Sequence, residues 1–278
     1  MSMDNVYRII SAEFIAPTVK RFEVEAARVA RYWRPGQFVI VRALADGERI
    51  PLTVVDADPY AGTIVLIVQS VGKTTRTLNA LGLGDSIPDV AGPLGSPSEI
   101  ESFGTVVVIG GGVGTAIAYP TARALAAAGN RVVVIVGARS SDLLILVDEL
   151  QAVADQLIVT TDDGTAGRGG LVTDALAEVI SERHVDRVVA IGPIPMMSAI
   201  SGLTRHHDIP TVVSLNPIMV DGTGMCGGCR VTVAGETRFA CVDGPEFDAH
   251  GVDFDLLAAR NSTYCDFERR RLAELEET

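Results

Sequence analysis

The alternation of apolar strands with helical segments between residues 102 and 215 is the feature that most constrains the fold of this chain. Val106–Ile109 is a continuous apolar run, it ends in the glycine-rich turn 110–114, and a helical pattern follows at Thr115–Ala128. The alternation continues with strands expected at 131–136, 157–161, 187–191 and 211–215, and helices at 143–155, 171–183 and 196–205. This order predicts a parallel sheet with helices on both faces. Right-handed crossovers then give a doubly wound topology.

The first 98 residues instead predict a small β-barrel, because short apolar or alternating runs are separated by turn signals such as Arg34-Pro35-Gly36. One helix is expected near Lys73–Leu81. After the parallel sheet comes a loop rich in cysteine and glycine, and residues 253–274 predict a polar helix. We therefore expect three units: a barrel at 1–98, an α/β unit at 99–215, and a cysteine-bearing unit at 216–278. The runs expected as barrel strands are 7–10, 19–24, 38–42, 51–56 and 63–69.

Three of the four cysteines lie in the stretch from Asp221 to Cys241. Cys226 and Cys229 are separated by two residues, and eleven residues separate Cys229 from Cys241. Glycines around the first pair allow backbone N–H groups to turn toward sulfur. A plant-type 2Fe-2S loop has the spacing Cys-x4-Cys-x2-Cys followed by a distant cysteine, and here an aspartate stands at the first position. The pattern predicts a 2Fe-2S cluster held by Asp221, Cys226, Cys229 and Cys241.

Three alternatives to this ligand set remain open. Structural zinc also uses Cys-x2-Cys pairs and accepts aspartate, although so many glycines are unusual in a zinc site. A disulfide requires an oxidising compartment, which nothing in the sequence indicates. Cys265, in the expected C-terminal helix, is a possible replacement for Asp221 as fourth ligand. We favour the aspartate and interpret Cys265 as an ordinary thiol.

The glycine turn 110–114 is a candidate binding site for a nucleotide pyrophosphate, because it joins a buried strand to the start of a helix. A ligand-free tight turn is the alternative. Arg139 and Ser140 lie at the end of the next strand, where the adenosine ribose of a dinucleotide is bound. We find no acidic residue there to bind its 2′-hydroxyl. The choice between NADH and NADPH is therefore open. Gly192 and Pro193 end the fourth strand, and the two methionines that follow, Met196 and Met197, also fit as core residues.

Two segments of the barrel are candidates for binding a flavin diphosphate. Strand alternation places Arg49, Pro51 and Thr53 on one face, and an arginine can pair a phosphate through two N–H groups. Gly72-Lys73-Thr74-Thr75 precedes a short helix and resembles a phosphate cradle. A solvated surface is the plain alternative for each segment.

Composition limits the function classes. With 23 Lys and Arg against 35 Asp and Glu, the net charge of −12 argues against nucleic acid as a partner. We expect no signal peptide and no membrane span, and therefore a cytoplasmic protein. A non-enzymatic, zinc-bearing nucleotide-binding module remains an alternative.

The order of motifs resembles the ferredoxin–NADP reductase superfamily over essentially the whole chain. Within it, the chain is similar to dihydroorotate dehydrogenase electron-transfer subunits, and most similar to small (alpha) subunits of NADH-dependent reduced ferredoxin:NADP oxidoreductases, also called sulfide dehydrogenase small subunits. The motifs are RPGQF, RIPLT, VGKTT, GPLG, GGGVGTA, GARSSDLL, GPIPMM, DGTGMCGGC and CVDGPEF. Two positions depart from common patterns: Ile191 replaces a frequent cysteine, and Asp221 replaces the cysteine usual in dihydroorotate dehydrogenase subunits.

The resemblance implies an oxidoreductase that passes electrons between NAD(H), FAD and a 2Fe-2S cluster, with NADP(H) possible. It implies a larger flavin and iron–sulfur partner subunit and access to ferredoxin through that complex. Membership of such a complex would also imply flavin-based electron bifurcation. There are two alternative activities. One is NADPH-dependent reduction of ferredoxin or of sulfide/polysulfide, and the other is electron transfer for dihydroorotate dehydrogenase. By motif, the implied FAD contacts are Arg49, Pro51, Leu52, Thr53, Gly72, Lys73 and Thr74, and the nucleotide contacts are Gly111, Gly112, Gly114, Thr115, Arg139, Gly192 and Pro193.

Overall fold

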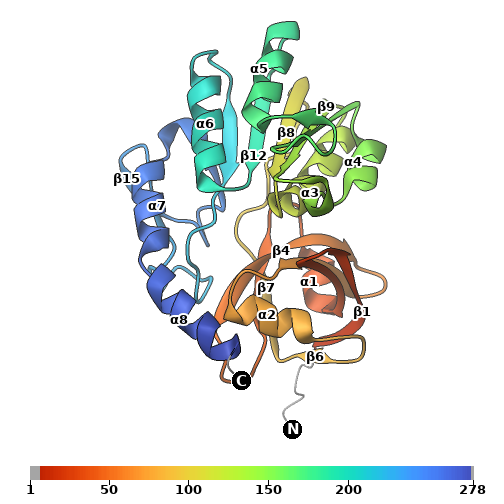
Figure 1. Cartoon of the computed structure of the whole chain (residues 1–278), viewed down its shortest axis with the longest axis vertical. Helices are drawn as coiled ribbons and strands as arrows, with labels where there is room; N and C mark the ends of the chain where they lie inside the picture. The colour runs from red at the N-terminus through yellow and green to blue at the C-terminus, as the bar shows by residue number, and fades with distance from the viewer. Residues whose placement is uncertain (1–6, 277–278) are drawn as a thin grey trace.

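The computed structural model describes residues 7–276 and begins with a curled antiparallel sheet in the order β6-β1-β2-β5-β4-β3-β7 (Figure 1). Its edge strands β6 and β7 are separated only by Pro88, so the sheet must curl until its two edges approach each other. The expected barrel is therefore confirmed in the form of a curled sheet. Its elements are β1 (Tyr7–Ala16), β2 (Val19–Glu25), α1 (Ala27–Tyr32), β3 (Phe38–Arg42), β4 (Arg49–Asp58), β5 (Thr63–Gln69), α2 (Lys73–Ala80), β6 (Ser86–Ile87) and β7 (Asp89–Leu94).

A second sheet follows in the order β11-β10-β9-β8-β12-β13-β16. Strands β10, β9, β8, β12 and β13 are parallel, which confirms the predicted doubly wound α/β arrangement. The elements are β8 (Thr105–Gly111), α3 (Gly114–Ala127), β9 (Arg131–Ala138), η1 (Ser141–Leu143), α4 (Val147–Val153), β10 (Gln156–Thr161), β11 (Arg168–Gly169), α5 (Val172–Glu182), β12 (Arg187–Ile191), α6 (Ile194–Arg205) and β13 (Thr211–Ser214).

Two apolar layers hold this sheet between its helices. On one face, Val106, Val108 and Val134 pack against α3 and α4. On the other face, Ile109 and Ile135 pack against α5 and α6, as Figure 1 shows. Burial on both faces explains why these strands are continuous apolar runs in the sequence.

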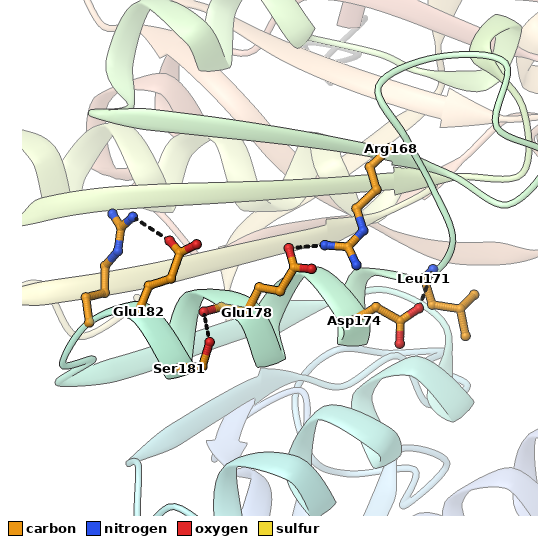
Figure 2. Close-up of polar contacts among 7 residues, drawn as sticks. Arg168, Leu171, Asp174, Glu178, Ser181 and Glu182 are labelled. Atoms are coloured by element: carbon orange, nitrogen blue, oxygen red, sulfur yellow. Dashed lines mark hydrogen bonds and ion pairs between the residues drawn. The ribbon is translucent and has the colours of Figure 1, made fainter.

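The outer surface of α5 carries ion pairs and capping contacts (Figure 2). Arg168 of β11 pairs with Glu178, and the Asp174 carboxylate accepts the Leu171 N–H at 3.1 Å at the start of the helix. The amphipathic pattern of the sequence therefore places α5 at the surface of the molecule.

The last segment is more structured than a loop and one helix. It contains the hairpin β14 (Arg230–Val233) and β15 (Glu236–Phe239), then β16 (Glu246–Asp248) and η2 (Ala249–Gly251). Strand β16 joins the second sheet antiparallel to β13, so that sheet is mixed. The expected helix at 253–274 is divided into α7 (Phe254–Ser262) and α8 (Cys265–Glu276). Helix α8 crosses back to the curled sheet and contacts α2.

Strand β4 connects the two sheets. Val55 on β4 packs with Ala116 of α3 in an apolar cluster shared by both units. Beside this cluster, Arg123 of α3 makes two contacts with Asp56 of β4, at 2.6 and 3.0 Å. Among the helices within residues 7–276, none is long and apolar enough to cross a bilayer.

Candidate functional site

The glycine turn lies at the centre of the second sheet, where the order of the strands reverses. Strand β8 has β9 on one side and β12 on the other, and the carboxyl ends of β8 and β12 are neighbours. In open α/β sheets, ligands bind in the crevice at such a switch point. The turn that the sequence predicts as a pyrophosphate site is therefore placed at the edge where a nucleotide would bind.

Each glycine of this turn is required for a different structural reason. Gly112 has φ +56°, and a side chain added there would meet no atom within 4 Å, so this residue faces open space. Its own N–H donates to the Gly137 carbonyl at 2.8 Å. A Cβ at Gly110 would lie 2.7 Å from the Cα of Thr115, and Thr115 is 3% exposed, so its hydroxyl lies beneath the turn. A Cβ at Gly114 would collide with the Ile191 backbone.

Gly111 ends β8, and Gly192 directly follows β12, the neighbouring strand. A Cβ on Gly192 would lie 3.2 Å from the Cα of Gly111, so the two backbones approach closely. The thioether of Met196, at the start of α6, lies against both glycines. Pro193 caps α6 and is exposed at the rim. Met197 is fully buried, which confirms the interpretation of that methionine as a core residue.

Acidic residues gather at the end of β9, contrary to the expectation from the sequence. Arg139 is exposed, but Ser140 donates to the Asp142 carboxylate at 2.5 Å, and the Asp163 N–H donates to the Arg139 carbonyl at 3.2 Å. The Thr165 hydroxyl and N–H lower the pKa of Asp163, so its carboxylate is stabilised as an anion. Asp142 lies only three residues after Arg139, so a local sequence signal was missed. Asp163 could not be anticipated in this way, because it follows β10, a strand that only the folded sheet places beside β9.

The candidate flavin residues of β4 occupy two faces. Ile40 pairs with Pro51 and Phe38 pairs with Thr53, and cross-strand pairs share a face. Arg49, Pro51 and Thr53 therefore share one face, as predicted, and it is the outer face of the curled sheet. Leu52 pairs with Val39 and packs against the core inside the sheet, so only its backbone is available to a ligand on the outer face.

The predicted phosphate cradle is the start of α2. Gly72 is the N-cap, and the Thr75 hydroxyl accepts the N–H groups of Val71 and Gly72, both at 3.0 Å. Lys73 is half-buried, while the Thr74 hydroxyl donates to Glu48 at 2.9 Å. The geometry thus includes an acidic neighbour that the sequence motif alone did not indicate.

Two of the predicted cluster ligands are brought together in the core. The sulfur atoms of Cys229 and Cys241 are 3.2 Å apart, and these residues are 1% and 2% exposed. Burial, together with the neighbouring Cys229 thiol, raises the pKa of Cys241 to about 12, while the Gly224 N–H acts in the opposite direction. All four cysteines of the chain lie within the described residues and are free thiols, so the disulfide alternative is not realised.

The other two predicted ligands lie on the exposed part of the same loop. The two Asp221 carboxylate oxygens accept the N–H groups of Thr223 and Cys226, at 2.9 and 2.8 Å. These hydrogen bonds, Thr223 first, lower the pKa of Asp221. The Cys226 sulfur accepts the Gly228 N–H at 3.4 Å. Asp221 thus stabilises the loop, and its oxygens retain lone pairs for a metal.

The donor set fits an iron–sulfur cluster in its chemistry. It offers three thiols, glycine N–H groups directed at sulfur, and left-handed backbone at Gly222, Gly224 and Gly227 that lets the loop change direction tightly. Within residues 7–276, no three His, Cys, Asp or Glu side chains converge as they stand into a metal-binding group. The Cys265 sulfur lies on α8, 3.9 Å from the Asn261 carbonyl.

The cysteine loop adjoins the outer face of the curled sheet at β3 and β7. A Cβ on Gly222 would lie 2.6 Å from Leu94 Cδ1 and 2.9 Å from Ile40 Cγ1. Ile40 is the cross-strand partner of Pro51 on the candidate flavin face. Phe38 and Ile40 also share one apolar core with Cys229 and Cys241. The candidate flavin face and the candidate cluster loop are therefore in contact, which local sequence patterns did not predict.

A buried carboxyl outside these sites was also missed. Glu246 on β16 accepts a hydrogen bond from Ser98 at 2.6 Å, and burial raises its pKa. It lines a cavity of about 740 Å³ together with Arg187, Arg205 and His250. This cavity lies at the amino ends of β12 and β13, opposite the nucleotide edge, so it is a separate feature.

Comparisons with known proteins agree with this arrangement. Residues 216–253 match the iron–sulfur cluster binding domain of dihydroorotate dehydrogenase B, and residues 108–202 match the oxidoreductase NAD-binding domain. A dihydroorotate dehydrogenase B (NAD(+)) electron transfer subunit homolog from Thermotoga maritima is 50% identical over 261 residues, covering 94% of this chain and 92% of that protein. The corresponding subunit from Geobacillus thermodenitrificans is 32% identical over 253 residues, covering 88% and 96%.

Comparison with solved structures agrees with these sequence matches. A chain in the structure of an NADH-dependent reduced ferredoxin-NADP oxidoreductase, studied for flavin-based electron bifurcation, superposes with a TM-score of 0.94 at 47% identity, and 100% of each chain is covered. A flavohemoglobin from Malassezia yamatoensis with bound FAD and heme has a TM-score of 0.58 at 16% identity, covering 73% of this chain and 57% of that one. The latter shows a shared fold only.

Proposed function

The chain belongs to the family of dihydroorotate dehydrogenase B electron transfer subunits, and we propose that it carries electrons between NAD(H), FAD and a 2Fe-2S cluster inside a ferredoxin:NADP oxidoreductase complex. It is an oxidoreductase subunit of the ferredoxin–NADP reductase type, with NAD-binding and iron–sulfur-binding regions. Segments 1–98, 99–215 and 216–278 are the proposed flavin, nucleotide and cluster units. The match of residues 216–253 to an iron–sulfur domain favours iron over the zinc alternative.

We propose binding residues in this chain for each cofactor. The outer face of β4 and the start of α2 would hold FAD, and the turn at Gly112 with the rim at Pro193 would hold the nicotinamide nucleotide. Asp221, Cys226, Cys229 and Cys241 would hold the cluster. When bound, these groups supply hydride transfer and single-electron transfer. The residues themselves position the groups and exclude water, so this function requires no acid–base pair.

The observation that carries the proposal is the contact between the cysteine loop and the candidate flavin face. Gly222 packs on Ile40 and Leu94, and Ile40 pairs with Pro51. On the other side, Val55 of β4 packs on Ala116 in the first turn of α3, next to the nucleotide crevice. Strand β4 thus lies between the nucleotide crevice and the cluster loop. This order matches an electron path from nucleotide through flavin to cluster.

We propose NADH rather than NADPH as the nucleotide for this subunit. Asp142 and Asp163 flank Arg139 and Ser140, where a 2′-phosphate would have to bind. Carboxylates at this position accept a ribose hydroxyl and repel a phosphate.

An anaerobic titration of the purified chain with each nucleotide tests both the function and this preference. We expect NADH to bleach the visible absorbance at a concentration at least about tenfold below that needed for NADPH. A preference for NADPH would mean that Arg139 outweighs the acidic residues and would favour the NADPH-dependent ferredoxin or sulfide/polysulfide reductase alternative. A colourless protein that neither nucleotide bleaches would refute the redox function.

The role of Asp221 as a cluster ligand is tested by Asp221→Cys. A carboxylate is a harder ligand than a thiolate, so we expect the variant to retain a cluster with an altered reduction potential and EPR signal. Asp255→Cys is the control, because it makes the same substitution at an exposed carboxylate in the first turn of α7, outside the cysteine loop. An unchanged potential and EPR signal in Asp221→Cys would remove Asp221 from the ligand set.

The proposed partner is a larger flavin and iron–sulfur subunit that exchanges electrons with NADP and ferredoxin. The support is the match in length and fold to one chain of the ferredoxin-NADP oxidoreductase. The second candidate function is electron transfer for a dihydroorotate dehydrogenase, which the names of several relatives support. Purifying the native complex and assaying ferredoxin-dependent NADP reduction against dihydroorotate oxidation distinguishes the two. Coupled reduction of ferredoxin and NAD by NADPH in that complex would establish bifurcation.

A further inference from the structure

The thioether of Met196 lies against the backbone where the neighbouring strands β8 and β12 end. A Cβ on Gly111 would have the Met196 sulfur as its nearest neighbour, and a Cβ on Gly192 would lie 2.6 Å from the Met196 methyl carbon. Gly111 ends β8 and Gly192 directly follows the adjacent strand β12, one on either side of the switch point. The side chain therefore occupies space that both strands leave free by having no side chain of their own.

Met196 packs against the same core as the neighbouring Met197, but the two methionines differ in burial. Met197 is 0% exposed and belongs to the core beneath α6. Met196 is only partly buried and lies one position earlier, toward the carboxyl edge of the sheet where Pro193 is exposed. Methionine combines a flexible chain with a polarisable sulfur, which packs favourably against aromatic rings. A side chain of this kind at a ligand edge can adapt to a flat aromatic group.

We propose that Met196 positions the nicotinamide nucleotide, with its thioether as the apolar surface on which the bound nucleotide packs in the crevice. This inference rests on the proposed function, because it assumes that a nicotinamide nucleotide binds at this edge. This role gives a second explanation for glycine at positions 111 and 192, besides the close approach of a phosphate to the backbone. A larger side chain at Gly111 or Gly192 would displace the Met196 thioether.

Oxidative footprinting of the full chain measures this contact directly. Hydrogen peroxide transfers one oxygen atom to a methionine sulfur, giving the sulfoxide and water. With saturating NAD+, we expect Met196 to be oxidised about fivefold or more slowly, because the ligand covers its sulfur. Met225, which is 88% exposed on the cysteine loop, is the internal reference whose rate should not change. Peptide mass spectrometry separates Met196 from Met197 by fragment masses.

Substitutions provide an independent measurement of the same contact. Met196→Ala should raise the Kd for NAD+ about fivefold, whereas Met196→Leu, which keeps the volume, should stay within about twofold. Met197→Leu is the matched control, because it alters the adjacent methionine in the core and should leave the Kd unchanged.

The outcomes are distinguishable from a failure of the proposed function. Equilibrium dialysis of NAD+ is run on the same samples. Binding of NAD+ without protection of Met196, or with an unchanged Kd in Met196→Ala, would overturn the positioning role alone. Absence of NAD+ binding by the wild-type chain would overturn both proposals.

Discussion

Glu246 lies in an environment that differs strongly from water. Its carboxyl is buried at the junction of β16 with the linker between the two sheets, and Ser98 donates to it at 2.6 Å. Burial raises its pKa, the Ser98 hydrogen bond and the Arg187 charge act in the opposite direction, and the Glu99 charge adds to the rise. The folded state therefore binds a proton that the unfolded state releases at lower pH. Stability must fall as pH rises through this window.

Glu246→Gln should remove this pH dependence. The variant carries no proton to lose, so its free energy of unfolding should stay flat from about pH 4.5 upward, where the wild type declines. Near pH 8 the variant should be more stable by on the order of 1 kcal/mol, because a neutral amide replaces a buried charge. Urea unfolding at several pH values measures this. Glu101→Gln, an exposed carboxyl on the same linker, should match the wild type. Identical slopes in Glu246→Gln and wild type would contradict the prediction.

Helix α2 depends on a buried cation from the neighbouring strand β2. The Lys20 ammonium, on a residue 7% exposed, donates to the carbonyls of Asn79 and Leu81 at 3.0 and 2.6 Å, at the C-terminal end of the helix. It also lies 5.0 Å from the centre of the Phe14 ring. Asn79 in turn donates to the Val68 carbonyl at 3.1 Å. The contacts at the C-terminal end of α2 therefore hold the whole helix in place, including the proposed phosphate cradle at its N-terminal end.

Lys20→Met should destabilise the protein by about 1–3 kcal/mol, because buried carbonyls lose their donor and the end of the helix loses a cation. We also expect weaker retention of FAD on dilution, since α2 would no longer be held in place. Thermal unfolding and flavin fluorescence measure the two effects. Arg8→Met, an exposed cation on β1, is the control. Unchanged flavin retention in a measurably destabilised Lys20→Met variant would separate α2 from the flavin site.

The whole molecule is held together across β4. Arg123 of α3 makes a two-pronged ion pair with Asp56, whereas the second pair across the same interface, Arg21 with Glu149, has a single contact of 3.8 Å. Burial by itself would raise the pKa of Asp56, but the hydrogen bonds and charge of Arg123 outweigh it and lower the pKa. The stabilisation is therefore present above the ordinary carboxyl range and is lost as pH falls through the lowered pKa.

Asp56→Asn should cost about 1 kcal/mol at neutral pH and loosen the two sheets relative to each other, because the paired geometry is lost. Hydrogen exchange in α3 and at the linker 95–104 should rise more than exchange inside either sheet. Glu149→Gln removes the weaker pair and should cost only a few tenths of a kcal/mol, roughly the value for an exposed contact. Equal effects of the two substitutions would mean that the apolar cluster around Val55 alone sets the interface.

The sequence by itself determined the order of the units and most of their strands and helices. Continuous apolar runs such as Val106–Ile109 must be buried on both faces, and Gly110–Gly114 can only be a tight strand-to-helix turn, so local patterns suffice. The cysteine spacing likewise indicated the chemistry of the last segment.

Only the tertiary structure decided how these parts meet. It placed Gly222 against Ile40, brought Asp163 beside Arg139, put Met196 between Gly111 and Gly192, and added β16 to the second sheet. Each of these contacts joins residues that are distant in sequence or separated by a turn. Such contacts depend on strand order and on side-chain volume at close packing, which no local periodicity encodes.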